Sequence, residues 1–489
     1  MTTSDTAEMG QKVRSAVIWR SGSQIVAQAI AWLSTFLVIR LLAPEDYGLF
    51  AMTQVMLVFL NTMNGYGIAS ALIREAELSD QRLRQALGLL LLLNGTLATI
   101  QFLTAPLVTA YFAQPMVADL LRVQAAMYLL TPWMALPHAM LSRAMNFRSP
   151  AQVRLVAALA GAGTALACAL GGAGVWTLVA APMVLFLTEA VGMTIAARAP
   201  LRPSFNFSGL GSIAGFGGLM TATQFFWFVQ SQADVIIAGR VLDVHSLGVY
   251  TTGLFLAQLL ATKFVPPINE VAYAAYARMQ GSGPDPLLAT IRLVLLIALP
   301  SYAGMAVVAE PLVLTLLGPQ WHAIATILPI LSGAMVMLTL QILFAPATNA
   351  LGKPGIALRV SMAGSVIMPL VFLIAAPHGL QGLAWGWVIG MGAMLGLTVG
   401  LSARPLGLPL RQLVSAIAPP ALAALAMAAG VVAVNRLLPD MPALAELALL
   451  VPLGGALYLA AMGLIARERL VEAWRFARGT AGAAPAVTG

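Results

Sequence analysis

Charged side chains are scarce in this sequence, in which Lys, Arg, Asp and Glu together make up only 9% of the 489 residues. A soluble domain carries roughly a quarter charged residues, so the composition excludes a cytosolic enzyme. Cysteine is nearly absent: Cys168 stands alone, which excludes an intrachain disulfide. The four histidines lie far apart and lack the spacing of metal ligands. The sequence therefore predicts no metal site and no cofactor.

Hydrophobic residues, in contrast, make up 60% of the chain and gather in long runs. We count fourteen candidate spans, each long enough to cross about 30 Å of hydrocarbon. The loops between them are short and leave no room for a folded domain outside the membrane. The sequence predicts an all-α polytopic membrane protein with spans at 16–42, 47–72, 86–110, 118–140, 152–171, 175–197, 211–239, 247–272, 288–309, 323–347, 356–377, 381–402, 412–434 and 444–466.

The distribution of cations orients these spans. An even number of spans places both termini on one side of the membrane. Of the 26 Lys and Arg residues, 20 lie on the side of the termini and four on the other side, whereas Arg20 and Lys263 lie inside spans. This asymmetry predicts that the N and C termini are both cytoplasmic. The basic residues then face anionic lipid headgroups, so membrane lipids are expected partners and nucleic acid is not.

The two halves of the chain resemble each other at an offset of about 200 residues. The segment VIRLLAPEDYGLF (38–50) matches AGRVLDVHSLGVY (238–250), so that Arg40 aligns with Arg240 and Gly48 aligns with Gly248. Six spans separate the equivalents, which predicts two parallel six-helix repeats. We expect an N-lobe at 1–205 (helices 1–6), a C-lobe at 206–405 (helices 7–12), and helices 13–14 with a cytoplasmic tail at 406–489.

Four spans carry polar side chains at helical spacing between apolar flanks. Polar groups in hydrocarbon cost free energy, so these stripes are expected to face a watery cleft between the lobes. The alternative is that they form hydrogen bonds between helices. The stripes comprise Arg20, Gln24 and Gln28 in span 1; Gln54, Asn61 and Asn64 in span 2; Gln224, Trp227, Ser231 and Asp234 in span 7; and Gln258, Thr262 and Asn269 in span 8.

Charged residues inside spans need a partner or a wet cavity, since a cation near mid-bilayer costs about 2.5–3.5 kcal/mol. Arg20 and Lys263 are therefore candidates to clamp an anionic substrate in the cleft. The alternatives are that Arg20 reaches the cytoplasmic headgroups and that Lys263 pairs with Glu270 or Glu189. Asp234 and Glu189 are candidates to carry a coupling proton or Na⁺, or to neutralise a neighbouring cation.

Several segments resemble the signatures of a known group of transporters. They are RLLAPEDYGLF (40–50), ALIREAELSD (71–80), RAMNFR (143–148) and GVW (174–176). With fourteen spans, a 6+6 repeat and two extra helices, the chain resembles the Wzx-type polysaccharide flippases of the multidrug/oligosaccharidyl-lipid/polysaccharide exporter superfamily. The resemblance covers nearly the whole chain.

This resemblance implies a transporter of the bacterial inner membrane and not an enzyme. It would move undecaprenyl-diphosphate-linked oligosaccharide repeat units from the cytoplasmic to the periplasmic leaflet by alternating access. O-antigen, capsule or exopolysaccharide synthesis would follow, with a polysaccharide polymerase and a chain-length regulator as further partners. Cations on the first and eighth helices of the family hold the diphosphate, which points to Arg20 and Lys263. The last two helices would form a groove for the polyprenyl tail.

The uncharged part of such a lipid-linked oligosaccharide needs hydrogen-bonding amides and aromatic faces. The candidates that would contact the glycan are Gln24, Gln28, Asn61, Asn64, Gln224 and Trp227.

Other functions stay open at this point. A cation-coupled multidrug exporter of the same superfamily would favour acidic residues in the cleft, and Arg20 and Lys263 count against it. A polysaccharide polymerase or ligase would need catalytic groups on a substantial periplasmic loop, whereas the predicted loops are short. A lipid II flippase is the nearest functional alternative.

We expect alkaline phosphatase fused after Gly489 to be inactive, because this reporter is active only when it is exported and the predicted C terminus is cytoplasmic. A fusion after Asp440, in the predicted periplasmic turn between spans 13 and 14, is the matched control and should be active. An active C-terminal fusion would contradict the even number of spans.

Overall fold

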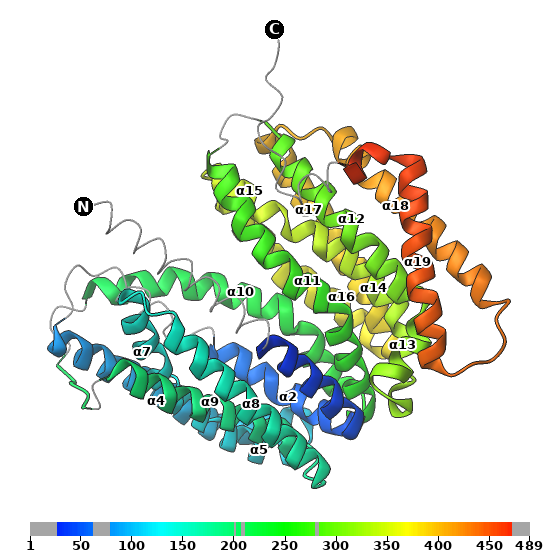
Figure 1. Ribbon diagram of the computed structural model, residues 1–489. Coiled ribbons are helices and arrows are strands. Elements are labelled where there is room, and N and C mark those ends of the chain that lie inside the picture. Colours follow the sequence, from blue (N-terminus) through cyan, green and yellow to red (C-terminus); the bar gives the residue numbers. More distant parts are fainter. Residues whose placement is uncertain (1–26, 62–78, 200–201, 207–210, 279–282, 472–489) are drawn as a thin grey trace, which may run out of the picture. The chain divides into compact units, whose positions relative to one another are not determined.

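The computed structural model describes residues 27–61, 79–199, 202–206, 211–278 and 283–471 (Figure 1). Within these ranges all regular secondary structure is helical. Helices suit an apolar chain, because each helix satisfies its own backbone hydrogen bonds where no water is present. The chain forms two compact units, unit 1 over Met1–Gly248 and unit 2 over Val249–Gly489.

Unit 1 begins with an apolar helix over Ala27–Leu41. The α8 and α9 helices pack tightly as a pair, and Gly161 of α8 allows the side chain of Leu185 to approach closely. The helices of this unit that follow are α2 (Pro44–Asn61), α4 (Asp80–Phe112), α5 (Met116–Gln124), α6 (Ala126–Leu130), α7 (Pro132–Arg143), α8 (Arg148–Leu170), α9 (Trp176–Ala197) and α10 (Gly211–Val241).

Unit 2 contains most of α11 and all later helices. Its last two helices lie along α12, as Figure 1 shows for α18 and α19. The elements are α11 (Val244–Arg278), α12 (Asp285–Val307), α13 (Ala309–Leu316), the short η1 (Pro319–Trp321), α14 (Ile324–Ile342), α15 (Phe344–Ala350), α16 (Gly355–Ala375), η2 (Ala376–His378), α17 (Gly379–Leu406), α18 (Leu410–Asn435) and α19 (Ala443–Ile465).

The prediction of an all-α membrane protein is confirmed. Each predicted span overlaps a described helix, and among the described residues nine helical segments are long and apolar enough to cross a membrane. The predicted span 118–140 differs, because it consists of α5, α6 and α7 instead of one helix. Pro132 begins α7, since it lacks the N–H group that a helix continuing from α6 would need there. The number of crossings, the repeat and the side of the termini stay predictions.

The boundary between the two compact units lies at residues 248 and 249, whereas the predicted lobes meet at 205 and 206. The units follow packing, and α10 packs against α2 of the first unit. The predicted lobes follow sequence equivalence and stay a prediction.

Prolines inside helices free backbone carbonyls, and side chains from other helices bind several of these carbonyls. A proline has no N–H to offer the carbonyl four residues before it. In three places a distant side chain supplies the missing donor. Thr194 Oγ1 donates to Trp133 O at 3.1 Å (freed by Pro137), Tyr458 Oη to Leu296 O at 2.9 Å (freed by Pro300), and Asn269 Nδ2 to Ile342 O at 3.1 Å (freed by Pro346).

The paired prolines of α18, Pro419 and Pro420, free two consecutive carbonyls. One guanidinium binds both of them: Arg469 donates to Ser415 O at 2.8 Å and to Ala416 O at 3.0 Å. Arginine suits this task because its donors form a planar fork. The arginine therefore replaces, from the segment after α19, the two hydrogen bonds that the helix cannot make.

The first turns of α2 and α11 touch through glycine. A Cβ on Gly48 would lie 2.0 Å from the carbonyl oxygen of Val244, and a Cβ on Gly248 would lie 1.8 Å from that of Pro44. Only glycine permits this approach of two backbones. Beside it, His245 Nδ1 lies 2.8 Å from Glu45 Oε1, and this hydrogen bond holds the pKa of the Glu45 carboxyl below its ordinary value.

We expect Arg469→Ala to destabilise unit 2, because it leaves the carbonyls of Ser415 and Ala416 without donors inside a membrane helix. Hydrogen bonds to a charged group are worth about 1.5–3 kcal/mol each, so the melting temperature of the purified protein should fall by several degrees. The melting temperature of Arg469→Lys should lie between those of the wild type and Arg469→Ala, since an ammonium lacks the planar fork of donors.

The matched control for this substitution is Arg467→Ala, at an exposed position two residues away. It should melt like the wild type. Equal melting temperatures for Arg469→Ala and Arg467→Ala would show that the guanidinium contributes nothing to stability.

Candidate functional site

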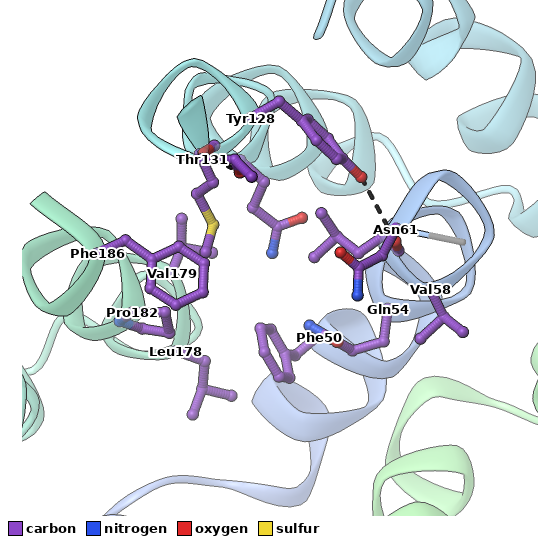
Figure 2. A pocket seen from close by; sticks show the side chains of 13 residues that line it. Phe50, Gln54, Val58, Asn61, Tyr128, Thr131, Leu178, Val179, Pro182 and Phe186 are labelled. Atoms are coloured by element: carbon purple, nitrogen blue, oxygen red, sulfur yellow. Dashed lines mark hydrogen bonds between the residues drawn. The ribbon is translucent and has the colours of Figure 1, made fainter. Parts of the chain in front are cut away.

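A cavity with a mainly apolar lining and several polar side chains lies within unit 1, between α2, α5, α6 and α9 (Figure 2). Its volume is about 320 Å³. Figure 2 shows Gln54 and Asn61 of α2 across the cavity from Pro182 and Phe186 of α9, with Tyr128 directed toward α2. The lining residues are Phe50, Gln54, Leu57, Val58, Asn61, Gln124, Met127, Tyr128, Thr131, Leu178, Val179, Pro182 and Phe186.

The break between α5 and α6 positions the polar side chains of this cavity. Gln124, the last residue of α5, is 1% exposed and donates through Nε2 to Thr53 Oγ1 at 3.1 Å. The hydroxyl of Thr53 in turn donates to the carbonyl of Phe50 at 2.7 Å. Tyr128 Oη donates to Leu57 O at 3.4 Å. These bonds fix the broken helix against α2 and hold its amide at the cavity.

Two hydrogen-bond acceptors beside the cavity lack an ordinary donor. Gln124 Oε1 is buried and has no hydrogen-bond partner among the described residues. Pro182 lacks an N–H, so the carbonyl of Leu178 in the same wall loses its helical donor. Buried acceptors without donors are costly. The carbonyl of Leu178 favours an occupant that brings a donor, such as a hydroxyl-bearing group or water, whereas Gln124 Oε1 is enclosed by protein.

No charged side chain is among the described residues that line the cavity, and Phe50 and Phe186 add aromatic faces. An uncharged group with hydroxyls on its edges and apolar faces, such as a sugar ring, fits this combination of amides, hydroxyls and aromatic rings.

The polar stripes predicted from the sequence include the cavity residues of α2 but not those of the opposite wall. Asn61 and its stripe neighbour Gln54 line it as residues of α2. Gln124, Tyr128 and Thr131 were not among the predicted site residues. Their spacing of four and then three residues is a polar helical face, and this signal could have found them.

The other predicted residues of the first two spans lie partly outside the described ranges. Arg20, Gln24 and Asn64 fall on residues that the structure does not describe. Gln28 lies in the helix Ala27–Leu41 and is partly buried.

The predicted residues of spans 7 and 8 are distributed over α10 and α11. Gln224 and Trp227 are exposed on α10, Trp227 to 48%. Asp234 is buried in the same helix at 1% exposure. Lys263 is exposed on α11, and no carboxylate of the described residues lies within ion-pair distance of its ammonium. Asn269 is used between helices, in its bond to Ile342.

Glu189, the second candidate for ion coupling, has a structural partner. Its Oε1 lies 3.2 Å from Nε of Arg154, and its side chain is 13% exposed. The carboxylate thus neutralises a cation of the neighbouring helix α8 and is not the partner of Lys263.

Comparison with known proteins places this architecture among polysaccharide biosynthesis proteins. The family model described as "Polysaccharide biosynthesis protein" matches residues 37–326. The chain is similar to the succinoglycan biosynthesis transport protein ExoT of Rhizobium meliloti, with 23% identity over 68% of each chain. It is also similar to the lipopolysaccharide biosynthesis protein WzxC of Escherichia coli, with 21% identity over 74% of this chain and 78% of that one.

Two solved structures show which fold the helices adopt. The lipid II flippase MurJ in an inward closed conformation matches with a TM-score of 0.75 and 11% identity, over 93% of this chain and all of that chain. An inward-facing multidrug resistance MATE family transporter of the MOP superfamily matches with a TM-score of 0.62 and 16% identity, over 80% of this chain and 98% of that one. At these identities the likeness concerns the fold alone.

Proposed function

Because the chain belongs to the polysaccharide biosynthesis protein family, we propose that it flips undecaprenyl-diphosphate-linked oligosaccharide units from the cytoplasmic to the periplasmic leaflet. It is a multi-pass protein of the bacterial inner membrane. The observation that carries the proposal is the family match over 37–326, supported by relatives that are named for polysaccharide biosynthesis and its transport. Transport by alternating access would serve O-antigen, capsule or exopolysaccharide synthesis.

The cavity of unit 1 supports an uncharged glycan as the cargo. Asn61 and Gln54 would offer amides to its hydroxyls, and the carbonyl of Leu178, whose helical donor is replaced by Pro182, would add an acceptor. A sugar ring stacked on Phe50 or Phe186 would bury its apolar face.

The diphosphate of such a lipid would bind Lys263 and Arg20. A cation inside a membrane helix needs an anion, and Lys263 has no carboxylate partner among the described residues. A diphosphate carries about two negative charges at neutral pH, which would offset this cost. An unbalanced cation is unsuited to a cationic drug, so the multidrug alternative is disfavoured.

For coupling to an ion, Asp234 is the better of the two candidates. It is buried in α10, whereas Glu189 is held by Arg154. The coupling ion would be H⁺ or Na⁺. A polysaccharide polymerase and a chain-length regulator would take over the glycan in the periplasm.

A lipid II flippase is the second candidate function. Lipid II also carries a diphosphate-linked polyprenyl group, and the fold of this chain is compatible with either cargo. The family match favours the oligosaccharide over lipid II.

We expect deletion of the gene to abolish the surface polysaccharide and to accumulate lipid-linked oligosaccharide at the cytoplasmic leaflet, detected by mass spectrometry of extracted lipids. Unchanged polysaccharide without such accumulation would refute the proposal. Rescue by an unrelated lipid II flippase would favour the second candidate.

Arg20→Ala and Lys263→Ala should each lower surface polysaccharide at least tenfold in the complemented deletion strain, since a charge-assisted contact is worth about 1.5–3 kcal/mol. The control is Lys353→Ala, an exposed lysine in the turn before α16. Full complementation by both Arg20→Ala and Lys263→Ala at wild-type protein levels would exclude the diphosphate contact.

Gln124→Leu should reduce export about tenfold while the protein remains inserted, because it removes the unused acceptor and the bond to Thr53. Gln101→Leu is the matched control: Gln101 is equally buried and bonds Leu121 O at 2.8 Å, yet it does not line the cavity. Equal export by the two variants, normalised to protein level, would remove the cavity from the transport pathway.

A further inference from the structure

The helix α11 carries two consecutive prolines in its interior, Pro266 and Pro267. Neither has an N–H, so the carbonyls of Thr262 and Lys263 lose their helical donors. Inside a membrane such carbonyls need a donor from elsewhere. This break therefore creates two neighbouring hydrogen-bond acceptors in the middle of an apolar helix.

The same motif occurs once more in the described residues, and there its carbonyls are occupied. In α18 the carbonyls freed by Pro419 and Pro420 bind the two arms of one guanidinium, at 2.8 and 3.0 Å. A pair of freed carbonyls can thus hold a group with two donors. Single proline breaks at Pro137, Pro300 and Pro346 are bound by side chains in the same way.

In α11 no side chain supplies these donors. Among the described residues no side chain donates to the carbonyl of Thr262 or Lys263, and the hydroxyl of Thr262 donates to Gln258 O at 2.9 Å. Thr262, Lys263 and both prolines are exposed. The acceptor pair is therefore accessible to a molecule from outside the helix bundle of unit 2.

The chemistry of the occupant follows from the charges around the break. Two acceptors call for hydrogen-bond donors or a coordinated cation, but the ammonium of Lys263 in the same turn repels a cation such as a guanidinium or Na⁺. It attracts an anion. A single ligand that satisfies both features carries hydroxyl donors next to an anionic group.

We propose that the Pro266–Pro267 break binds the hydroxyls of the sugar attached directly to the diphosphate, while Lys263 binds the phosphate. This inference rests on the proposed function and adds that the backbone carbonyls of Thr262 and Lys263 bind the first sugar. Backbone carbonyls accept a hydrogen bond from any suitably placed hydroxyl. The site therefore recognises the presence of a sugar ring and selects little between different sugars.

The test compares two probes on the purified full chain by native mass spectrometry. One is undecaprenyl diphosphate, and the other is undecaprenyl diphosphate that carries a single hexose. Two added hydrogen bonds predict about tenfold tighter binding of the hexose-bearing lipid by the wild type.

Two double variants restore the missing N–H groups. Pro266→Ala with Pro267→Ala rebuilds a stiff helix, and Pro266→Gly with Pro267→Gly restores the donors while it keeps the backbone flexible. Both should bind the two lipids equally, at the wild-type affinity for the bare diphosphate. If the glycine variant keeps the tenfold preference, the prolines act by bending the helix and the inference is overturned.

Two further comparisons keep the result unambiguous. Pro419→Ala with Pro420→Ala, where Arg469 already occupies the carbonyls, should retain the tenfold preference. Lys263→Ala should weaken the binding of both lipids and leave the ratio of their affinities unchanged. A wild type that binds both lipids equally overturns this inference alone, whereas a wild type that binds neither lipid overturns the proposed function.

Discussion

A backbone polar group inside hydrocarbon has no water to bind, and this constraint governs the structure described above. Helices satisfy it within themselves. Where a proline removes a donor, the molecule brings one from a distant part of the chain, as Tyr458 does for Leu296 and Arg469 does for α18. Each such bond joins two helices, so a local defect of one helix becomes a specific tertiary contact. In a bundle of nearly uniform apolar surfaces, these contacts add specificity that apolar packing alone lacks.

The same constraint divides the polar residues of the spans into two kinds. The hydroxyl of Thr194 donates to the backbone of a neighbouring helix and has no further donor to offer. Gln124 retains an oxygen with no described partner at the wall of a cavity. The first kind serves the fold, and the second kind is what a polar cargo requires. The two kinds of polar residue do not differ in residue type or in spacing along the sequence. Only the hydrogen-bond partner in the structure distinguishes them.

The sequence therefore predicts the fold better than the site. Long apolar runs and their flanking cations are local, and every predicted span overlaps a helix. The interruption of span 118–140 before α7 follows from Pro132, yet the apolar length of the span does not indicate it. The role of Asn269 could not be predicted, because the rotation of α11 against α14 depends on packing across many residues. The partner of Glu189 likewise depends on how α8 lies against α9. Gln124 was not predicted, although Tyr128 and Thr131 follow it at helical spacing.

The contact of Glu45 with His245 joins two positions 200 residues apart, which the predicted repeat makes equivalent. In a homodimer of one ancestral repeat, each position would face its own copy across the two-fold axis. Glycine against glycine, as at 48 and 248, is compatible with that symmetry. Glutamate against glutamate is not, because like charges at this distance repel. An acid paired with a base at equivalent positions therefore requires two copies whose sequences differ.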